Sequence, residues 1–555
     1  MDLSLNSCVQ STETVQHLFA KYRDDPYMVA KVHNYVCFQL PNIMENIRRT
    51  REERQQRIAE LTTEQEGFIE RFLTTHHYFY VPATENFVFY DGQHYSLALE
   101  DSILHHILTT ITSEEKRLMI WKQRTKVYLM KRIKDQLLVK TIPESYTIQH
   151  VLECLHPALF ETKQEAKYFL TIIGDNLLRK HGDLIHFIPG KAKTFLRELA
   201  NVSQVLFGGN ALGTFKHKYH DQHEYAQCRV VNCNDSVANE HIWGRILRNA
   251  SVDMLCVACH YSTRYGSSDE YVAKYSHSET LEQSIFYLRN HSQSQLVELF
   301  IAEYLQVTIL PPLEWTDDPP SRPSSRQISW KNMQYLWRHF LQSLRLPTIM
   351  FQQDLKQQLV DNMPGNYRET TDSFIEVSSR FMPAIRSFMR FWEQTMVIDE
   401  TGEYEIDELC TLYTKWGAGT SAGGGLNESQ MLDLVAYYFP YVEIEKEKYV
   451  YGVRCILWDK SLDIQTALEI QKETLRERAR ATDEPHSPYS TTLYDAYLEY
   501  CKYVKHRGEW TPASETERGE SCPIVSKSFF EKYVREHFGR YIFEENYLAY
   551  SWLFS

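Results

Sequence analysis

Four cysteines in the middle of the chain have a spacing that suits a zinc ion. Cys228 and Cys233 form C-x4-C, a gap of 22 residues follows, and Cys256 and Cys259 form C-x2-C. Zinc prefers four nitrogen or sulfur ligands in a tetrahedron, and two cysteine pairs can supply them. The sequence therefore predicts a structural zinc site. The alternative is four buried free cysteines, which are common in protein cores.

Three histidines are alternative ligands for the same zinc ion. His217 and His220 lie upstream of the first cysteine pair, and His260 directly follows the second. A catalytic zinc would also need an open coordination position and a nearby acid or base. The nearest H-x-E, at 277–279, follows the cysteines, whereas zinc deaminases carry it before them. A structural role is therefore expected.

A second feature is a strongly basic segment. Residues 116–140 carry nine lysines and arginines and one acid, Asp135, in a chain whose net charge is −13. Such a segment can neutralise nucleic-acid phosphates. Trp121 and Tyr128 lie among the basic residues and could stack on bases. The basic residues expected to contact nucleic acid are Lys116, Arg117, Lys122, Arg124, Lys126, Lys131, Arg132 and Lys134. The alternative is an amphipathic helix whose basic face pairs with acids elsewhere in the protein.

A smaller basic and aromatic cluster, with Lys216 and Lys218, lies next to the cysteines. If it shares a face with residues 116–140, nucleic-acid binding is favoured. The apolar residues of that segment are expected to face the core. They are Leu118, Met119, Val127, Met130, Ile133 and Leu137.

Two glycine-rich stretches come close to catalytic motifs. Residues 208–214 differ from the phosphate loop G-x-x-x-x-G-K-[ST] because Thr214 stands where the phosphate-binding lysine belongs. Residues 419–423 match G-x-S-x-G formally, but they lie inside a run of glycines where a chance match is easy. Both stretches are expected to be ordinary turns or loops, and the chain is expected to lack catalysis of its own.

Composition limits the class of protein. The chain has 555 residues, of which 43% are hydrophobic and 13% aromatic, so it can bury a large core. The net negative charge argues against a globally basic coat protein. No apolar run is long enough to span a bilayer, and no signal peptide is expected from the first residues. The 11 scattered cysteines suit a reducing compartment.

These residues are expected to be carried by a predominantly α-helical, multi-domain α+β fold. A small β-hairpin or sheet is expected near 78–97, with Asp91-Gly92 as its turn, and a mixed Cys/His-rich segment near 207–275. Helices are expected at 113–139, 351–363 and 368–397. The predicted domains are an N-terminal helical region 1–77, a helical domain with a small sheet and the basic helix 78–205, a Cys/His-rich region 206–315, a linker 316–328, a C-terminal helical domain 329–482, a linker 483–492 and an aromatic-rich helical module 493–555.

Several stretches of the chain resemble a family of uncharacterised proteins from mimivirus-like nucleocytoplasmic large DNA viruses. They are 168–176 (YFLTIIGDN), 256–265 (CVACHYSTRY), 391–408 and 455–460 (CILWDK). Residues 87–155 and 493–538 are also weakly similar to the modules on either side of the motor in poxvirus-type primase-helicases. No intact ATP-binding loop lies between them. The resemblance implies a viral setting in the host cytoplasm, the viral factory or the virion.

Taken together, these features predict a viral nucleic-acid-associated protein. It would be a non-catalytic accessory or scaffold factor in DNA replication or transcription, with nucleic acid and other viral replication or transcription proteins as partners. One alternative is a divergent primase-helicase-like NTPase or a metal-dependent nucleic-acid enzyme. Another is a structural virion or assembly protein, for which large exposed apolar patches would be expected.

Overall fold

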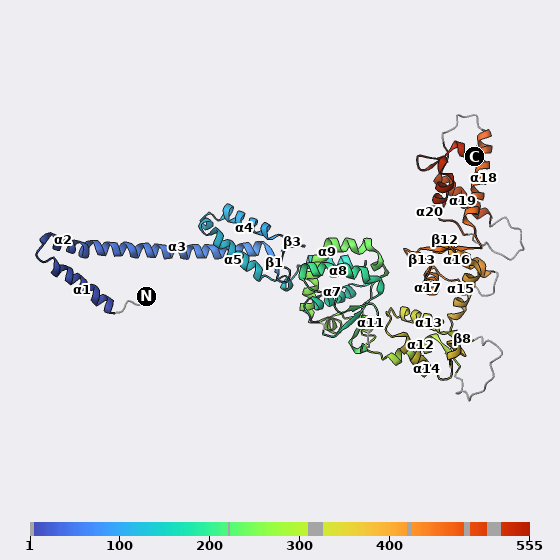
Figure 1. Ribbon diagram of the computed structural model, residues 1–555, viewed down its shortest axis with the longest axis horizontal. Coiled ribbons are helices and arrows are strands. Elements are labelled where there is room, and N and C mark those ends of the chain that lie inside the picture. The colour runs from blue at the N-terminus through green and yellow to red at the C-terminus, as the bar shows by residue number, and fades with distance from the viewer. Residues whose placement is uncertain are drawn as a thin grey trace. The chain divides into compact units, whose positions relative to one another are not determined.

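A computed structural model describes residues 5–180, 182–219, 223–308, 326–418, 425–481, 489–507 and 523–554. The chain forms two compact units (Figure 1). The first comprises Met1–Ser292 and Arg345–Ile349, and the second comprises Gln293–Leu344 and Met350–Ser555. Helices dominate both units and the sheets are small, which confirms the expected predominantly helical α+β fold. Among the described helices, none is long and apolar enough to cross a bilayer.

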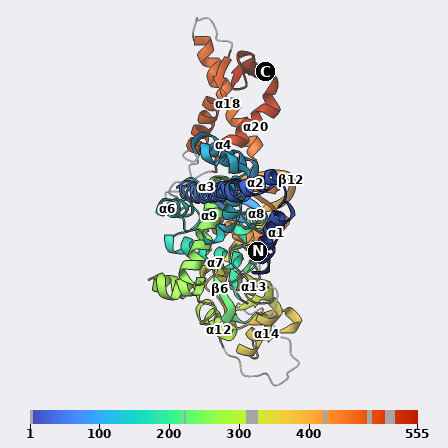
Figure 2. The ribbon, with the colours of Figure 1, turned by 90° about the vertical axis from the view of Figure 1, so that its left-hand side faces the viewer.

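The first unit begins with helices that lead into one long helix. They are α1 (Leu5–Lys21), α2 (Pro26–Asn34), a π-helical turn (Tyr35–Gln39) and α3 (Leu40–Thr75). Figure 2 shows the first unit with α3 seen nearly along its axis. Only the C-terminal part of α3 is buried, through Gln65, Phe68, Ile69 and Phe72. The N-terminal part of α3 therefore lacks the tertiary packing that normally stabilises an amphipathic helix.

A small antiparallel sheet follows α3, as expected. Its strands are β1 (His77–Val81), β2 (Asn86–Tyr90) and β3 (Tyr95–Ala98), paired in the order β1-β2-β3. The turn between β2 and β3 starts at Asp91, whose carboxylate accepts hydrogen bonds from the backbone N–H groups of Gln93 and His94 at 2.7 Å. Gly92 takes the positive φ of 97° that this turn requires. The Asp-Gly pair was therefore a correct turn signal.

The basic segment does not form the single helix expected for 113–139. The observed elements are α4 (Glu100–Glu114), a 3₁₀ helix (Lys116–Trp121), α5 (Lys122–Asp135) and a second 3₁₀ turn (Leu138–Lys140). Together with α3 they bury a cluster that includes Phe72, Ile103, Ile107 and Leu129. This cluster holds α5 against α3 and α4 and leaves its other face exposed.

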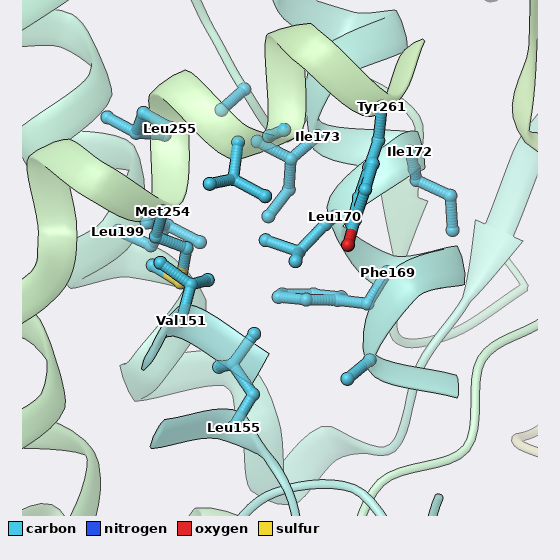
Figure 3. Close-up of a cluster of buried hydrophobic side chains, with 14 of the residues drawn as sticks. Val151, Leu155, Phe169, Leu170, Ile172, Ile173, Leu199, Met254, Leu255 and Tyr261 are labelled. Atoms are coloured by element: carbon cyan, nitrogen blue, oxygen red, sulfur yellow. The ribbon is translucent and has the colours of Figure 1, made fainter. Parts of the chain in front are cut away.

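The main core of the first unit is a set of helices around α9 (Glu240–Tyr265). The other elements are α6 (Ser145–Leu155), α7 (Lys163–Leu177), β4 (Ile185–Phe187), α8 (Lys193–Phe207), β5 (Phe215–Lys216), β6 (Cys228–Val230), α10 (Ser268–Glu270) and α11 (Glu279–Ile285). Strands β5, β4 and β6 form a small parallel sheet in that order. Figure 3 shows side chains from α6, α7, α8 and α9, among them Val151, Phe169, Leu199 and Met254, interleaved in this core.

Helices α7 and α9 approach each other closely at Gly174. A Cβ atom built on Gly174 would lie 2.0 Å from the carbonyl oxygen of Ala258, far inside van der Waals contact. The neighbouring Asp175 is buried, and its carboxylate accepts hydrogen bonds from the Ser262 hydroxyl (2.6 Å) and the Ser268 N–H (2.7 Å). Burial raises the pKa of Asp175. The two helices therefore touch backbone to backbone at one point and hydrogen-bond beside it.

The second unit contains α12 to α20 and four small sheets. Its elements are α12 (Gln293–Tyr304), β7 (Gln306–Val307), β8 (Gln327–Ser329), α13 (Trp330–Ser343), α14 (Gln352–Asn362), β9 (Tyr367–Arg368), β10 (Ser373–Ile375), β11 (Val377–Ser378), α15 (Met382–Thr395), β12 (Met396–Glu405), α16 (Ile406–Ala418), α17 (Glu428–Tyr438), β13 (Glu443–Glu445), β14 (Tyr449–Cys455), α18 (Lys460–Ala481), β15 (Tyr489–Thr492), α19 (Leu493–Arg507), α20 (Lys527–Phe538), β16 (Ile542–Phe543) and β17 (Tyr547–Ala549). The helix expected at 351–363 is confirmed by α14. The prediction of a continuous helix at 368–397 is wrong in its first part, where β10 pairs with β8 and β9, and β11 pairs with β7.

The linkers expected at 316–328 and 483–492 stay predictions. The boundary between the two units falls at Ser292 and Gln293, so α12 belongs to the second unit. Of the two predicted linkers, only residues 326–328 and 489–492 lie within the described part, and they contribute to strands β8 and β15. Strand pairing, which depends on residues far away in sequence, is what makes these end segments extended.

A buried ion pair joins elements of the second unit. The Lys460 ammonium lies 2.5 Å from the Glu408 carboxylate, and both side chains are almost fully buried. Glu408 also accepts hydrogen bonds from the backbone N–H groups of Glu405 and Ser526. The rings of Tyr404 and Phe529 lie 4.2 and 4.7 Å from the ammonium. Burial disfavours both charges. The pair therefore depends on these hydrogen bonds and ring contacts, which compensate for the lost hydration.

We predict that Gly174→Ala destabilises the protein by about 1–3 kcal/mol, because overpacking forces α7 and α9 apart. The matched control is Gly244→Ala in the interior of α9, where the nearest atom to an added Cβ lies 3.7 Å away. The control should be neutral or stabilising by about 0.5–1 kcal/mol, since alanine favours helices over glycine. Urea unfolding of both variants measures the difference, and equal stabilities would contradict the close approach.

Candidate nucleic-acid interface

Most of the basic residues predicted to bind nucleic acid lie at the surface. Lys116, Arg117, Arg124, Lys131, Arg132 and Lys134 are exposed, whereas Lys122 and Lys126 are half-buried. The opposite face of α5 is buried through Thr125, Leu129, Met130 and Ile133. The helix is therefore amphipathic, with its basic residues mainly toward solvent.

Three of these residues already have polar partners. Arg117 lies 3.0 Å from Glu64, and Lys134 lies 3.9 Å from Glu100. Lys122 donates a hydrogen bond to the Thr112 hydroxyl at 2.7 Å. The alternative expected from the sequence, that the basic face pairs with acids of the same protein, thus describes only part of this helix.

The remaining basic residues have no ion-pair partner within the described part of the chain. They are Lys116, Arg124, Lys126, Lys131 and Arg132. Arg124, Tyr128 and Lys131 recur at helical spacing on the exposed face of α5, and Arg132 lies beside them. Asp135, the one acid of the segment, is the last residue of α5 and lies on the same exposed side of the helix. We call Arg124, Tyr128, Lys131 and Arg132 the basic face.

Two aromatic rings hold the first arginine of the basic face. The Arg124 guanidinium carbon lies 4.3 Å from the ring centre of Trp121 and 5.7 Å from that of Tyr128. Such cation–π contacts fix an arginine side chain without neutralising its charge. Tyr128 itself is 51% exposed, so one side of this stack is accessible to a planar ligand.

The expected burial of the apolar residues is correct only in part. Leu118, Met130 and Ile133 are buried and Leu137 is half-buried, but Met119 and Val127 are exposed. Val127 lies within α5, two residues from both Thr125 and Leu129, and therefore faces away from these buried residues, whereas Met119 lies in the 3₁₀ helix. A 3₁₀ turn has three residues per turn, so it shifts which residues face the core relative to a continuous α-helix.

Lys216 and Lys218 lie on a different substructure from the basic face. Lys216 ends β5 and is exposed, and Lys218 is also exposed and forms an isolated β-bridge with Thr348. Strand β5 pairs with β4 in the main core, whereas α5 packs on β1, α3 and α4. The structure therefore does not join the two basic clusters into one surface.

The cysteines predicted to bind zinc lie in or beside the core. Cys256 and Cys259 are fully buried in the middle of α9, and Cys228 is buried on β6. Burial raises the pKa of Cys228 to about 11 and the pKa values of Cys233 and Cys259 to about 12, and it also raises that of Cys256. High pKa values favour the neutral thiol, whereas zinc binds the thiolate.

The histidines considered as alternative zinc ligands are likewise not gathered with the cysteines among the described residues. His217 lies 3.3 Å from the Ile188 carbonyl oxygen, and burial lowers the pKa of the half-buried His260. His220 lies outside the described residues. Among the side chains that the structure describes, no three of the types His, Cys, Asp and Glu are arranged to hold a metal ion. The zinc site stays a prediction.

One polar cluster gave no signal in the sequence. The buried Asp253 of α9 accepts hydrogen bonds from the Tyr95 N–H at 2.6 Å and from His94 at 2.7 Å. The His94 ring packs edge-on against His150, whose Nε2 lies 3.7 Å from the Cys154 sulfur. These contacts anchor the β2–β3 turn to the main core. His94 and Asp253 are too far apart in sequence for any local motif to show them.

The glycine-rich stretch 208–214 has the wrong surroundings for a phosphate loop. Gly208, with φ of 64°, ends α8, and the stretch leads into the short strand β5. Phosphate loops instead lead from a strand into the N-terminus of a helix. Thr214 is buried, and its hydroxyl lies 2.9 Å from both Asn176 and His186. The G-x-S-x-G stretch at 419–423 lies outside the described residues.

Comparison with known proteins identifies no relative: no protein-family model, curated protein or solved structure matches this chain.

We predict that the thiols of Cys256 and Cys259 react slowly with Ellman's reagent in the native protein. They are fully buried, whereas Cys8 and Cys37 are exposed and should react at once. The double variant Cys256→Ala/Cys259→Ala should leave the fast phase unchanged. All thiols should become reactive in denaturant.

Zinc analysis of the same samples tests the metal site. Close to one zinc per chain, released only when the buried thiols react, would support the predicted site. Fast native reaction of Cys256 and Cys259 would contradict the burial described above.

Proposed function

We propose that this protein binds nucleic acid through the basic face of α5 and acts as a non-catalytic accessory or scaffold protein. The observation that carries the proposal is a group of cations, Arg124, Lys131 and Arg132, without acidic partners in the described part of the chain, beside an exposed tyrosine. Three cations within nine residues form a local positive patch on a chain whose net charge is −13, and a polyanion is the natural ligand of such a patch.

The basic face would act through phosphate contacts and stacking. Each phosphate that a lysine or arginine neutralises releases condensed counterions, so binding strengthens as the salt concentration falls. Arg124 is already positioned by Trp121 and would contact a phosphate with little loss of side-chain entropy. The exposed ring of Tyr128 offers a surface on which an unpaired base can stack.

The biological setting rests on the family resemblance. It points to a large DNA virus, with DNA replication or transcription as the process and other viral replication or transcription proteins as partners. The virion or assembly role is the second candidate, and it is favoured by the exposed apolar residues at the N-terminal end of the chain, such as Tyr27, Phe38 and Ile47.

We predict that Arg124→Glu/Lys131→Glu/Arg132→Glu weakens nucleic-acid binding by at least about tenfold at low salt, because three cations that attract phosphates become anions that repel them. Fluorescence anisotropy against short single- and double-stranded DNA and RNA, at several salt concentrations, measures the effect. For a single strand, the slope of log affinity against log salt should become shallower by about 0.7 for each phosphate that the variant no longer neutralises.

The matched control reverses three other exposed cations of the first unit, Lys163, Lys193 and Arg197, with the same change in net charge. It should bind as the wild type does. Tyr128→Ala should weaken single-strand binding more than duplex binding, because only unpaired bases can stack. Equal losses of affinity in the two triple variants would mean that net charge alone drives binding, and no binding by the wild type at low salt would refute the proposal.

A further inference from the structure

The N-terminal half of α3 exposes a stripe of apolar side chains. Every residue from Cys37 to Glu60 is exposed. Within this stretch, five large apolar residues are 48–55% exposed. They are Leu40, Ile43, Met44, Ile47 and Ile58. Figure 1 shows this part of α3 extending from the helices that cover its other end. A row of exposed apolar side chains at regular helical spacing is typical of a protein interaction site.

The stripe continues the face by which α3 packs in its own unit. Leu40, Met44, Ile47 and Ile58 follow a spacing of three and four residues, and the same spacing runs on through Leu61, Gln65, Phe68 and Phe72. The later residues are buried or half-buried against the 3₁₀ helix 116–121 and α5. One continuous face is therefore covered at its C-terminal end and uncovered at its N-terminal end, among the residues that the structure describes.

Two arginines interrupt the stripe. Arg51 and Arg54 occupy the two positions that the three-and-four spacing places between Ile47 and Ile58, and neither has an ion-pair partner in the described part of the chain. The charges on the outer side of the helix, in contrast, pair with one another. Arg48 lies 2.6 Å from Glu45, and Arg49 lies 3.8 Å from Glu53. Arg51 and Arg54 are thus unpaired cations that lie within the apolar stripe.

We propose that residues 40–58 of α3 bind an amphipathic helix of a different protein, which carries carboxylates opposite Arg51 and Arg54. The apolar residues on either side of the arginines would pack as knobs into holes. The two arginines would pair with the acids in the middle of the interface, where partial desolvation strengthens charge-assisted hydrogen bonds. This surface is separate from the basic face of α5, and the proposal does not depend on nucleic-acid binding.

The same arginines argue against a second copy of this chain as the occupant. In a parallel pair of α3 helices, Arg51 would face Arg51 and Arg54 would face Arg54. In an antiparallel pair centred between them, Arg51 would face Arg54. Both arrangements place four guanidinium groups together without a carboxylate in the seam, and like charges brought together at an interface are destabilising. A partner with acids at these layers removes that cost.

Two synthetic helical peptides of about three heptads test the proposal on the full-length protein. Both carry leucine and isoleucine at their core positions. One has glutamate, and the other lysine, at the two layers that face Arg51 and Arg54. We expect the glutamate peptide to bind at least about tenfold more tightly in fluorescence anisotropy, because the charges are complementary. Arg51→Glu/Arg54→Glu should reverse the preference.

The control variant Arg49→Glu reverses one charge on the outer side of the helix and should keep the wild-type preference, whereas the single variant Arg51→Glu on the stripe should lose it. Met44→Ser/Ile47→Ser should weaken binding of both peptides. Circular dichroism shows whether each variant keeps its helix content. Failure of both peptides to bind, or equal binding of the two, would overturn the proposal. Sedimentation that shows a dimer of the wild type, absent in Ile47→Glu, would assign the stripe to a second copy instead.

Discussion

The backbone contact between α7 and α9 is the constraint on which the first unit depends. Gly174 has no side chain, so α7 approaches the Ala258 carbonyl of α9, and the buried Asp175 hydrogen-bonds across the same junction. Because α9 runs through the middle of the core, its position sets where α6, α8 and the β2–β3 turn can pack. It also places Cys256 and Cys259 in the interior. The two cysteines that suggest a metal ligand pair in the sequence lie, in the fold, on either side of Ala258, where α7 and α9 are in close contact.

Both proposed surfaces contain cations that have no ion-pair partner in the described part of the chain. Elsewhere in the described chain, many cations have carboxylate partners, from the exposed pairs along α3 to the buried Lys460 and Glu408. The basic face of α5 and the arginines of the α3 stripe do not. On α5, the cations accompany an exposed tyrosine, which suits a polyanion with planar bases. On α3, Arg51 and Arg54 lie among aliphatic side chains, which suits an acidic amphipathic helix.

Helix α3 links these two surfaces through one continuous face. Its C-terminal end is packed on α5 and the preceding 3₁₀ helix, so it supports the basic face from behind. Its N-terminal end offers the apolar stripe. A partner helix that covers the stripe would also rigidify α3, since most helical stability comes from tertiary packing of an amphipathic face. The proposed accessory or scaffold role would use such an arrangement, in which separate surfaces of one unit would bind a nucleic acid and a protein.

The sequence by itself determined the predominantly helical character, the Asp91-Gly92 turn and the surface exposure of most basic residues in 116–134. Each follows from local spacing or local turn chemistry, which tertiary contacts rarely override. The sequence did not determine the exposure of Met119 and Val127, the strands at 367–378 or the contact of His94 with Asp253. Those depend on which helix face the core covers, on pairing with distant strands and on a buried carboxylate far along the chain. The spacing of the α3 stripe was present in the sequence, but only the tertiary structure decided which end of it is covered, because burial depends on what packs against a helix.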